Sequence, residues 1–184
     1  MATIINDTHQ ALIEACRRDD RKAQYQLYHL YARQMYNVCL RIVNHVGEAE
    51  DILQESFVEA FRRLRDFRAE ASFGSWLKRI VVNRSINSLR KKKLTLFEDA
   101  AVFEHLPDEA EPIDEEPIHT RQLMQLVAEL PDGYRLVLSL YLFEDYKHSE
   151  IATLLNISES TSKSQYNRAK ARIREQLKKT SYAG

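Results

Sequence analysis

One amphipathic stretch, residues 72–93, constrains more than any other how this chain can fold. It reads SFGSWLKRIVVNRSINSLRKKK, with four basic residues at its end and with Trp76, Leu77, Ile80 and Val81 at helical spacing. We predict a helix whose first half buries an apolar side, and whose final cations favour a helix C-terminus. The basic end is either an ordinary solvated terminus or a contact for phosphate groups.

The rest of the composition also favours helices. The 184 residues include only four glycines and four prolines, which disfavours sandwiches and barrels. Apolar runs such as residues 136–143 are too short to cross a membrane. Residues 1–7 carry no basic residue and no long apolar region, so we expect no signal peptide and a cytoplasmic protein. Cys16 and Cys39 lie in helical patterns and are expected to be reduced core residues.

The formal net charge of zero hides three unlike segments. Residues 1–97 contain 17 Lys and Arg against 11 Asp and Glu, and residues 121–184 contain 10 against 7. Residues 98–117 contain none against 9, together with three of the four prolines, and are predicted to be an extended acidic linker. Basic blocks on both sides are typical of proteins that meet polyanions. The linker is either a solubilising spacer or a nucleic-acid mimic that lies in a basic channel of a partner.

Three helices are predicted before residue 72: one from a cap at Asp7 or Thr8 to Arg18, one over about 21–43, and one from near Glu48. Residues 45–47 separate the last two. Residues 65–75 are predicted to join the third helix to the stretch 72–93. The side chains expected to face the core are Leu27, Leu30, Tyr31, Val38 and Ile42 on the second helix and Leu53, Phe57, Phe61 and Leu64 on the third. The opposite side of the third helix is acidic, either as a solvated face or as a protein-docking face, and carries Glu48, Asp51, Glu55 and Glu59.

The C-terminal block has the pattern of a helix-turn-helix. Amphipathic helices are predicted over 120–130 and 133–143, the second with Leu136, Val137, Leu140 and Tyr141 buried. Residues 148–179 then predict a short helix with Ile151, Ala152 and Leu155 inward, a turn at Asn156, and a long helix capped by Ser158. The outward side chains of the long helix can bond to base edges and phosphates, and they are Ser160, Thr161, Lys163, Ser164, Asn167 and Arg168. An αα-hairpin with a basic surface is the alternative.

Two segments together resemble a known family. Residues 49–93, from AEDILQES to SLRKKK, resemble the second conserved region of extracytoplasmic-function sigma factors of the sigma-70 family, and residues 130–177 resemble their fourth region. The resemblance covers about residues 20–179. It implies an all-α protein in which a region 2 helical bundle (1–95) and a region 4 helix-turn-helix domain (119–184) are joined by an extended acidic linker (96–118).

The resemblance also implies a function and partners. A protein of this family is a dissociable subunit of bacterial core RNA polymerase that supplies promoter recognition and melting, with no catalytic chemistry, metal, cofactor or small-molecule substrate of its own. Its expected partners are core RNA polymerase, promoter DNA and an anti-sigma factor, often one anchored in the inner membrane.

Residue roles follow where the motifs match. The resemblance implies that Asp51, Gln54 and Glu55 dock on the clamp coiled coil of the largest polymerase subunits. It implies that Asn83, with the loop 67–75, captures a flipped base of the minus-ten element. The residues expected to hold phosphates beside that base are Arg84, Arg90, Lys91 and Lys92. The residues expected to contact the minus-thirty-five element in the major groove are Thr161, Lys163, Ser164, Asn167 and Arg168.

Some positions depart from the family pattern. Ser160, Thr161 and Ser162 stand where Gly-Thr-Val is usual, and Gln165 stands where Arg or Lys is frequent. Lys147 replaces a frequent Ser cap and Asn87 a common Asp. These departures do not threaten the expected fold, and they leave open the exact base preference and the packing near Ser162.

The sequence disfavours two other classes of function. A stand-alone helix-turn-helix regulator would account for residues 147–179 but would give the acidic docking face no task. An enzyme is disfavoured because the six histidines are scattered without metal-ligand spacing, and because the sequence has no Gly-rich phosphate loop or nucleophile motif.

Overall fold

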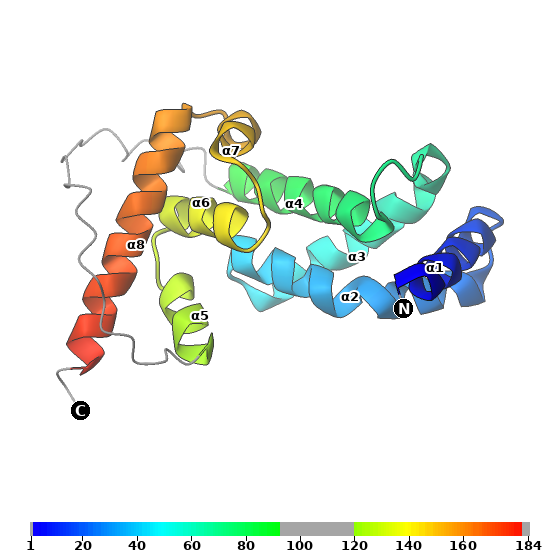
Figure 1. Ribbon diagram of the computed structural model, residues 1–184, viewed down its shortest axis with the longest axis horizontal. Coiled ribbons are helices and arrows are strands. Elements are labelled where there is room, and N and C mark those ends of the chain that lie inside the picture. Colours follow the sequence, from blue (N-terminus) through cyan, green and yellow to red (C-terminus); the bar gives the residue numbers. More distant parts are fainter. Residues whose placement is uncertain (1, 93–119, 182–184) are drawn as a thin grey trace. The chain divides into compact units, whose positions relative to one another are not determined.

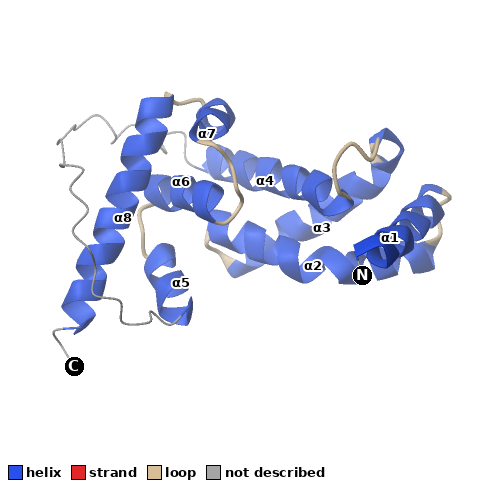
Figure 2. Cartoon of the chain, in the orientation of Figure 1, coloured by secondary structure: helices blue, strands red, loops and turns tan. Residues whose placement is uncertain are grey.

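The computed structural model describes residues 2–92 and 120–181, and within these ranges it contains helices and short connections but no strand (Figure 2). This confirms the all-α class. Side chains are described for residues 9–92 and 121–179. The chain divides into two compact units, residues 1–91 and 92–184. The predicted linker, residues 96–118, lies outside the described residues. None of the described helices is both long enough and apolar enough to span a membrane.

The first unit contains α1 (Ala2–Arg17), α2 (Arg21–Val43), α3 (Val46–Arg62), a 3-10 turn (Leu64–Asp66) and α4 (Phe73–Lys92). In Figure 1, α2, α3 and α4 run alongside one another, and successive helices point in opposite directions. The prediction that the first helix begins with a cap at Asp7 or Thr8 is wrong, because α1 begins five residues before Asp7, at Ala2.

Local side chains set the ends of α2 and α3. The Asp20 carboxylate accepts the backbone N–H groups of Lys22 and Ala23, which caps α2. Asn44 ends this helix in the left-handed conformation at φ 52°, which Asn tolerates better than most residues. Nδ1 of His45 then accepts the N–H of Glu48 at 3.2 Å, so α3 begins directly after His45. The predicted break is therefore confirmed, although it is shorter than expected.

Most side chains expected in the core of the first unit are buried. Leu27, Val38, Ile42, Leu53, Phe57 and Leu64 are buried as predicted, and so are Leu77, Ile80 and Val81 of α4. Each such side chain contributes roughly 1.5–3 kcal/mol when it is removed from water. Leu30 was predicted inward but is 52% exposed. At about 100° per residue it lies roughly 100° from the middle of the buried stripe of α2. Tyr31, Phe61 and Trp76 are only partly buried.

The two cysteines are free thiols buried in the first unit, as expected. Burial raises the pKa of Cys16 to about 11, and the nearby Asp20 carboxylate adds to this effect. A thiol with such a pKa stays protonated near neutral pH, so Cys16 packs as a small apolar side chain.

The second unit contains α5 (Thr120–Ala128), α6 (Asp132–Leu142), α7 (His148–Leu155) and α8 (Glu159–Ser181). Val127, Leu130, Leu138, Ala169 and Ile173 form a buried cluster between α5, α6 and α8. Leu136, Val137 and Leu140 are buried as predicted, whereas Tyr141 was expected inward and is 38% exposed. Its ring instead stacks on His148 at a centroid distance of 4.3 Å.

A buried arginine fixes the connection between α5 and α6. Nη1 of Arg135 donates to the backbone carbonyl of Leu130 at 3.0 Å, and Nη2 donates to Asp132 at 2.7 Å. Burial lowers the pKa of this guanidinium, and the two acceptors offset the loss of water.

The helix-turn-helix is confirmed in detail. Asn156 adopts φ 57° and ends α7, and the backbone N–H of Ile157 donates to the Ala152 carbonyl at 3.0 Å. The Ser158 hydroxyl accepts the N–H of Thr161 at 3.0 Å and so caps α8. Ile151 is buried in the angle between the two helices, whereas Ala152 is only half-buried.

Candidate functional site

The outer face of α3 carries the side chains predicted to dock on polymerase. Asp51, Gln54 and Glu55 are all exposed, and their spacing of three and four residues places them on one side of the helix. Val58 continues this side and is 49% exposed. We call Asp51, Gln54, Glu55 and Val58 the α3 face. It is acidic with one apolar side chain, which suits a partner surface that is basic and partly apolar.

Arg84 of α4 is bound by two carboxylates of α3. Its Nε donates to Oε2 of Glu59 at 2.6 Å, and its Nη1 donates to Oε2 of Glu55. Glu59 is also held by Nη1 of Arg63 at 3.1 Å. The residue that was predicted to hold phosphate therefore lies between α3 and α4 and contacts a residue that was predicted to bind polymerase.

The same contacts set the protonation of Glu59. The hydrogen bond from Arg84 is the main cause of a lowered pKa, and Arg63 adds to it, while partial burial of Glu59 acts in the opposite direction. The carboxylate is therefore ionised at neutral pH and can hold both guanidinium groups.

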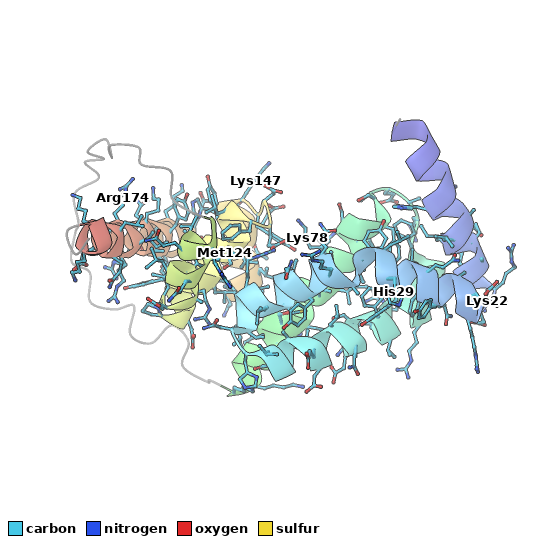
Figure 3. The ribbon with its side chains drawn as sticks, turned by 90° about the horizontal axis from the view of Figure 1, so that it is seen from below. Lys22, His29, Lys78, Met124, Lys147 and Arg174 are labelled. Atoms are coloured by element: carbon cyan, nitrogen blue, oxygen red, sulfur yellow. The ribbon has the colours of Figure 1, made fainter. Side chains whose placement is uncertain are left out.

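The rest of the α4 polar side is more open. Asn83 is exposed, next to Arg84. Arg90, Lys91 and Lys92 are exposed at the end of the helix, where cations are favoured by the helix dipole. One turn before them, the Ser88 hydroxyl donates to Oε1 of Glu48 at 2.5 Å, which is a second polar link between α4 and α3. Figure 3 labels Lys78, which lies on α4 before Asn83.

The segment before α4, predicted to take part in base capture, is held at its first end by α1. The Arg17 guanidinium donates to the backbone carbonyls of Leu64, at 3.3 Å, and Phe67. We call these two bonds the Arg17 clamp. Just beyond them, Ala69 has φ 56°, a conformation that costs a residue with a Cβ roughly 1 kcal/mol.

Aromatic rings hold the other end of this segment. Phe67 and Phe73 pack edge to face at 5.8 Å, and Trp76 lies against both, at 5.3 and 5.7 Å. Phe73 also contacts Tyr31 of α2 at 5.2 Å. Trp76 thus closes a four-ring cluster while part of its surface remains exposed, which leaves an aromatic face beside the segment.

The outward side of α8 carries the predicted major-groove contacts. Lys163 and Asn167 are exposed, and Thr161, Ser164 and Arg168 are half-buried. Nζ of Lys163 forms an ion pair with Glu159, one turn earlier in the same helix, at 2.7 Å. An exposed pair of this kind is worth at most about 1 kcal/mol and can be exchanged for a phosphate. Figure 3 labels Lys147, which directly precedes α7, and Arg174, which lies in the C-terminal half of α8.

Two departures from the family pattern lie on the buried side of α8. Ser162 and Gln165 are 0% and 3% exposed. The base preference was left open at Gln165, and the burial of this side chain places it away from the exposed side of α8. The Ser162 hydroxyl forms a hydrogen bond with Nδ1 of His148 at 2.9 Å.

His148 joins three helices of the second unit. Its ring stacks on Tyr141 of α6, lies 5.7 Å from Tyr166 of α8, and reaches Ser162. Burial is the main cause that lowers the pKa of His148 below its ordinary 6.5, and Lys163 and Lys170 add to this, while Glu159 opposes them. The neutral ring is therefore favoured at neutral pH.

Several of these residues could not be identified from the sequence. Arg17, Ser88 and His148 act on partners that are 14 to 50 residues away in the chain, which no local pattern reveals. Glu59 and Arg63 stand four residues apart, and that spacing could have predicted their pair.

Comparison with known proteins identifies the family to which both units are similar. The chain matches the family model described as sigma-70 region 2 over residues 27–95, and the model described as sigma-70, region 4, over residues 120–173. The first match includes the α3 face and α4, and the second includes the helix-turn-helix up to residue 173 of α8.

Whole-length relatives agree. The chain is 31% identical over 180 residues to the ECF RNA polymerase sigma factor SigW of Bacillus subtilis, covering 90% of this chain and 95% of that protein. It is 30% identical to the RNA polymerase sigma-H factor of Pseudomonas aeruginosa, covering 92% and 94%.

Solved structures share the fold. The sigma factor RpoE of Bartonella quintana, in complex with the anti-sigma factor NepR, matches with a TM-score of 0.54 at 19% identity, over 84% of this chain and 96% of that one. CnrH in complex with the cytosolic domain of CnrY matches with a TM-score of 0.53 at 21% identity, over 91% and 96%.

The fold and the two matched regions define a promoter-recognition subunit of RNA polymerase. The chain belongs to the extracytoplasmic-function subfamily of the sigma-70 family.

Proposed function

We propose that this sigma factor binds core RNA polymerase through Asp51, Gln54 and Glu55. The observation that carries the proposal is their joint exposure on one side of α3, in the region that matches sigma-70 region 2. Carboxylates on an exposed helix face steer a basic partner and fix its register. Val58 adds an apolar contact in the same face.

We further propose that α4 opens and holds the minus-ten element. Asn83 is exposed and stands seven residues after Trp76, so both lie on the same side of α4, about two turns apart. An extruded base could stack on the aromatic cluster and form hydrogen bonds with Asn83. The exposed basic end of the helix then supplies phosphate contacts from Arg90, Lys91 and Lys92. Arg84 is also assigned to phosphate, but in the free protein its guanidinium is bound by Glu55 and Glu59.

In the second unit, α8 contacts the minus-thirty-five element in the major groove. Its N-terminus is capped by Ser158 and its exposed side offers hydroxyl, amide and cationic groups, which match the donors and acceptors of base edges and phosphates. The residues that we assign to this contact are Thr161, Lys163, Ser164, Asn167 and Arg168.

An anti-sigma factor is proposed as the regulator. The support is that one structural neighbour is a sigma factor in complex with an anti-sigma factor. The family resemblance implies that such a regulator is often anchored in the inner membrane. The protein would then act in the cytoplasm, as a subunit without catalytic chemistry of its own.

Run-off transcription tests the function directly. Core RNA polymerase is incubated with a genomic promoter library, with and without this protein, and the transcripts are sequenced. We expect transcripts that start at a common pair of upstream elements and that require the protein. DNA binding without any polymerase-dependent transcript would contradict the proposal and would indicate a stand-alone helix-turn-helix regulator.

A further inference from the structure

The ion pairs of Arg84 place one guanidinium between the two surfaces that the proposed function uses. Arg84 is on α4 beside Asn83, and Glu55 is on the α3 face. Nη1 of Arg84 donates to Glu55. While this bond exists, the Glu55 charge is partly neutralised and that edge of the guanidinium is occupied. Neither residue is then fully available to polymerase or to DNA.

The two carboxylates hold Arg84 unequally. The Glu59 side chain is 28% exposed and is also bound by Arg63, whereas the Glu55 side chain is 64% exposed. A solvated carboxylate loses less when it changes partner, because water and an incoming cation compensate for the lost bond. Glu55 is therefore the exchangeable partner and Glu59 the anchor, which keeps the guanidinium oriented through Nε.

We propose that Arg84 exchanges partners when the sigma factor binds polymerase. A basic group of polymerase takes the Glu55 carboxylate, and the Nη1 edge of Arg84 becomes available to a phosphate of the strand that α4 holds. Arg84 thus couples docking to DNA contact, and linkage requires the coupling to act equally in both directions. The inference rests on the proposed function, because it takes the α3 face as the docking surface.

The coupling has a defined sign and size. In the free protein the Arg84–Glu55 pair weakens both polymerase binding and DNA binding. Replacing Glu55 should therefore strengthen the contact of Arg84 with DNA, and replacing Arg84 should strengthen the contact of Glu55 with polymerase. Because pairs this exposed contribute little, we expect changes of about two- to fivefold rather than orders of magnitude.

The DNA side is tested on the full chain without polymerase. Binding of a labelled single-stranded oligodeoxythymidine is measured by fluorescence anisotropy at low salt for Glu55→Gln and Glu50→Gln. Glu50 is the matched control because it is an exposed glutamate of α3, and the ion pairs described for Arg84 are with Glu55 and Glu59. Both variants remove one negative charge. We expect Glu55→Gln to bind about two- to fivefold more tightly than Glu50→Gln.

The same pair of variants is then measured with Arg84→Gln as the background. The difference between them should vanish, because the released guanidinium is gone. If the two variants bind equally while Arg84 is present, or if their difference persists without it, the exchange is wrong. Thermal unfolding of each variant verifies that it is folded.

Binding to core polymerase tests the partner exchange and the docking surface separately. Association with core polymerase is measured by sedimentation for Arg84→Gln and Asp51→Asn. Arg84→Gln should associate about two- to fivefold more tightly, because Glu55 loses its competing partner. Weaker association would show that Arg84 holds Glu55 in place for docking and would overturn the exchange. Unchanged association of Asp51→Asn would count against the docking surface itself, whatever Arg84→Gln does.

Discussion

The two helices that carry the proposed DNA contacts, α4 and α8, hold their polar side chains in different ways. In α4, Arg84 and Ser88 are bound by acidic residues of the neighbouring α3. In α8, the described ion pair of Lys163 is with Glu159 of the same helix. A change on α8 should therefore act locally on DNA contact, whereas a change on α4 or α3 should affect docking and DNA contact together.

The largest expected effect is the loss of association with core polymerase after changes in the α3 face. Asp51→Arg combined with Glu55→Arg should abolish association with core polymerase, because two attractive charges become repulsive. Both side chains are exposed, so the fold and the DNA affinity of the second unit should stay nearly intact. Sedimentation with core polymerase measures the loss, and Glu50→Arg is the control. Normal initiation by the double variant would disprove the α3 face as the docking surface.

The next largest effect is on transcription, after changes in the exposed side of α8. Arg168→Ala should lower transcription at promoters that depend on the upstream element by an amount equivalent to about 1–3 kcal/mol and should relax the preference at one base position. Lys163→Ala should weaken all sequences alike and flatten the salt dependence, because it removes a phosphate contact. Run-off transcription on a set of promoter variants separates the two patterns. Loss of polymerase association by either variant would contradict the assignment.

A smaller effect concerns the buried side of α8. Ser162→Ala removes the hydroxyl that bonds to Nδ1 of His148 and should destabilise the second unit by about 1 kcal/mol. Ser149→Ala is the control, because Ser149 is an exposed serine of the neighbouring α7. Thermal unfolding followed by circular dichroism measures both. Equal unfolding temperatures would mean that the His148 bond adds nothing to stability.

The smallest expected effect is a pH dependence of the stability of the second unit, caused by His148. Because its folded-state pKa is lowered, the unfolded chain binds more protons. The stabilisation is complete above about pH 6.5 and is lost as the pH falls through the folded pKa. The lowered pKa of Glu59 in the first unit acts only below its ordinary 4.5.

Thermal unfolding from about pH 7.5 to about 5.5, compared between the wild-type chain and His148→Asn, isolates this term. The wild-type chain should lose more stability than the variant. Parallel curves would exclude His148 as the source.

The sequence predicted the elements better than the contacts between them. The predicted range of α2, about 21–43, agrees with the observed Arg21–Val43, because a helical pattern of apolar residues can be read along the chain. The bond between Arg84 and Glu55, 29 residues apart, depends on how α3 and α4 pack, and local patterns carry no such information.

The burial of Gln165 could have been predicted. Ser162, Gln165 and Ala169 follow the helical spacing of a buried side, and this periodicity places Gln165 in the core, whereas the family resemblance left its effect on base preference open.

The donor of the Arg17 clamp lies outside the part of the chain that the family model for region 2 covers. The family model for region 2 begins at residue 27, after α1 has ended, yet Arg17 of α1 binds two carbonyls just before the segment that leads into α4. A minimal version trimmed to the matched residues would keep every side chain assigned here to polymerase or DNA. It would still lose the tether of that segment, so an engineer who transplants promoter specificity between sigma factors would need to move α1 with it.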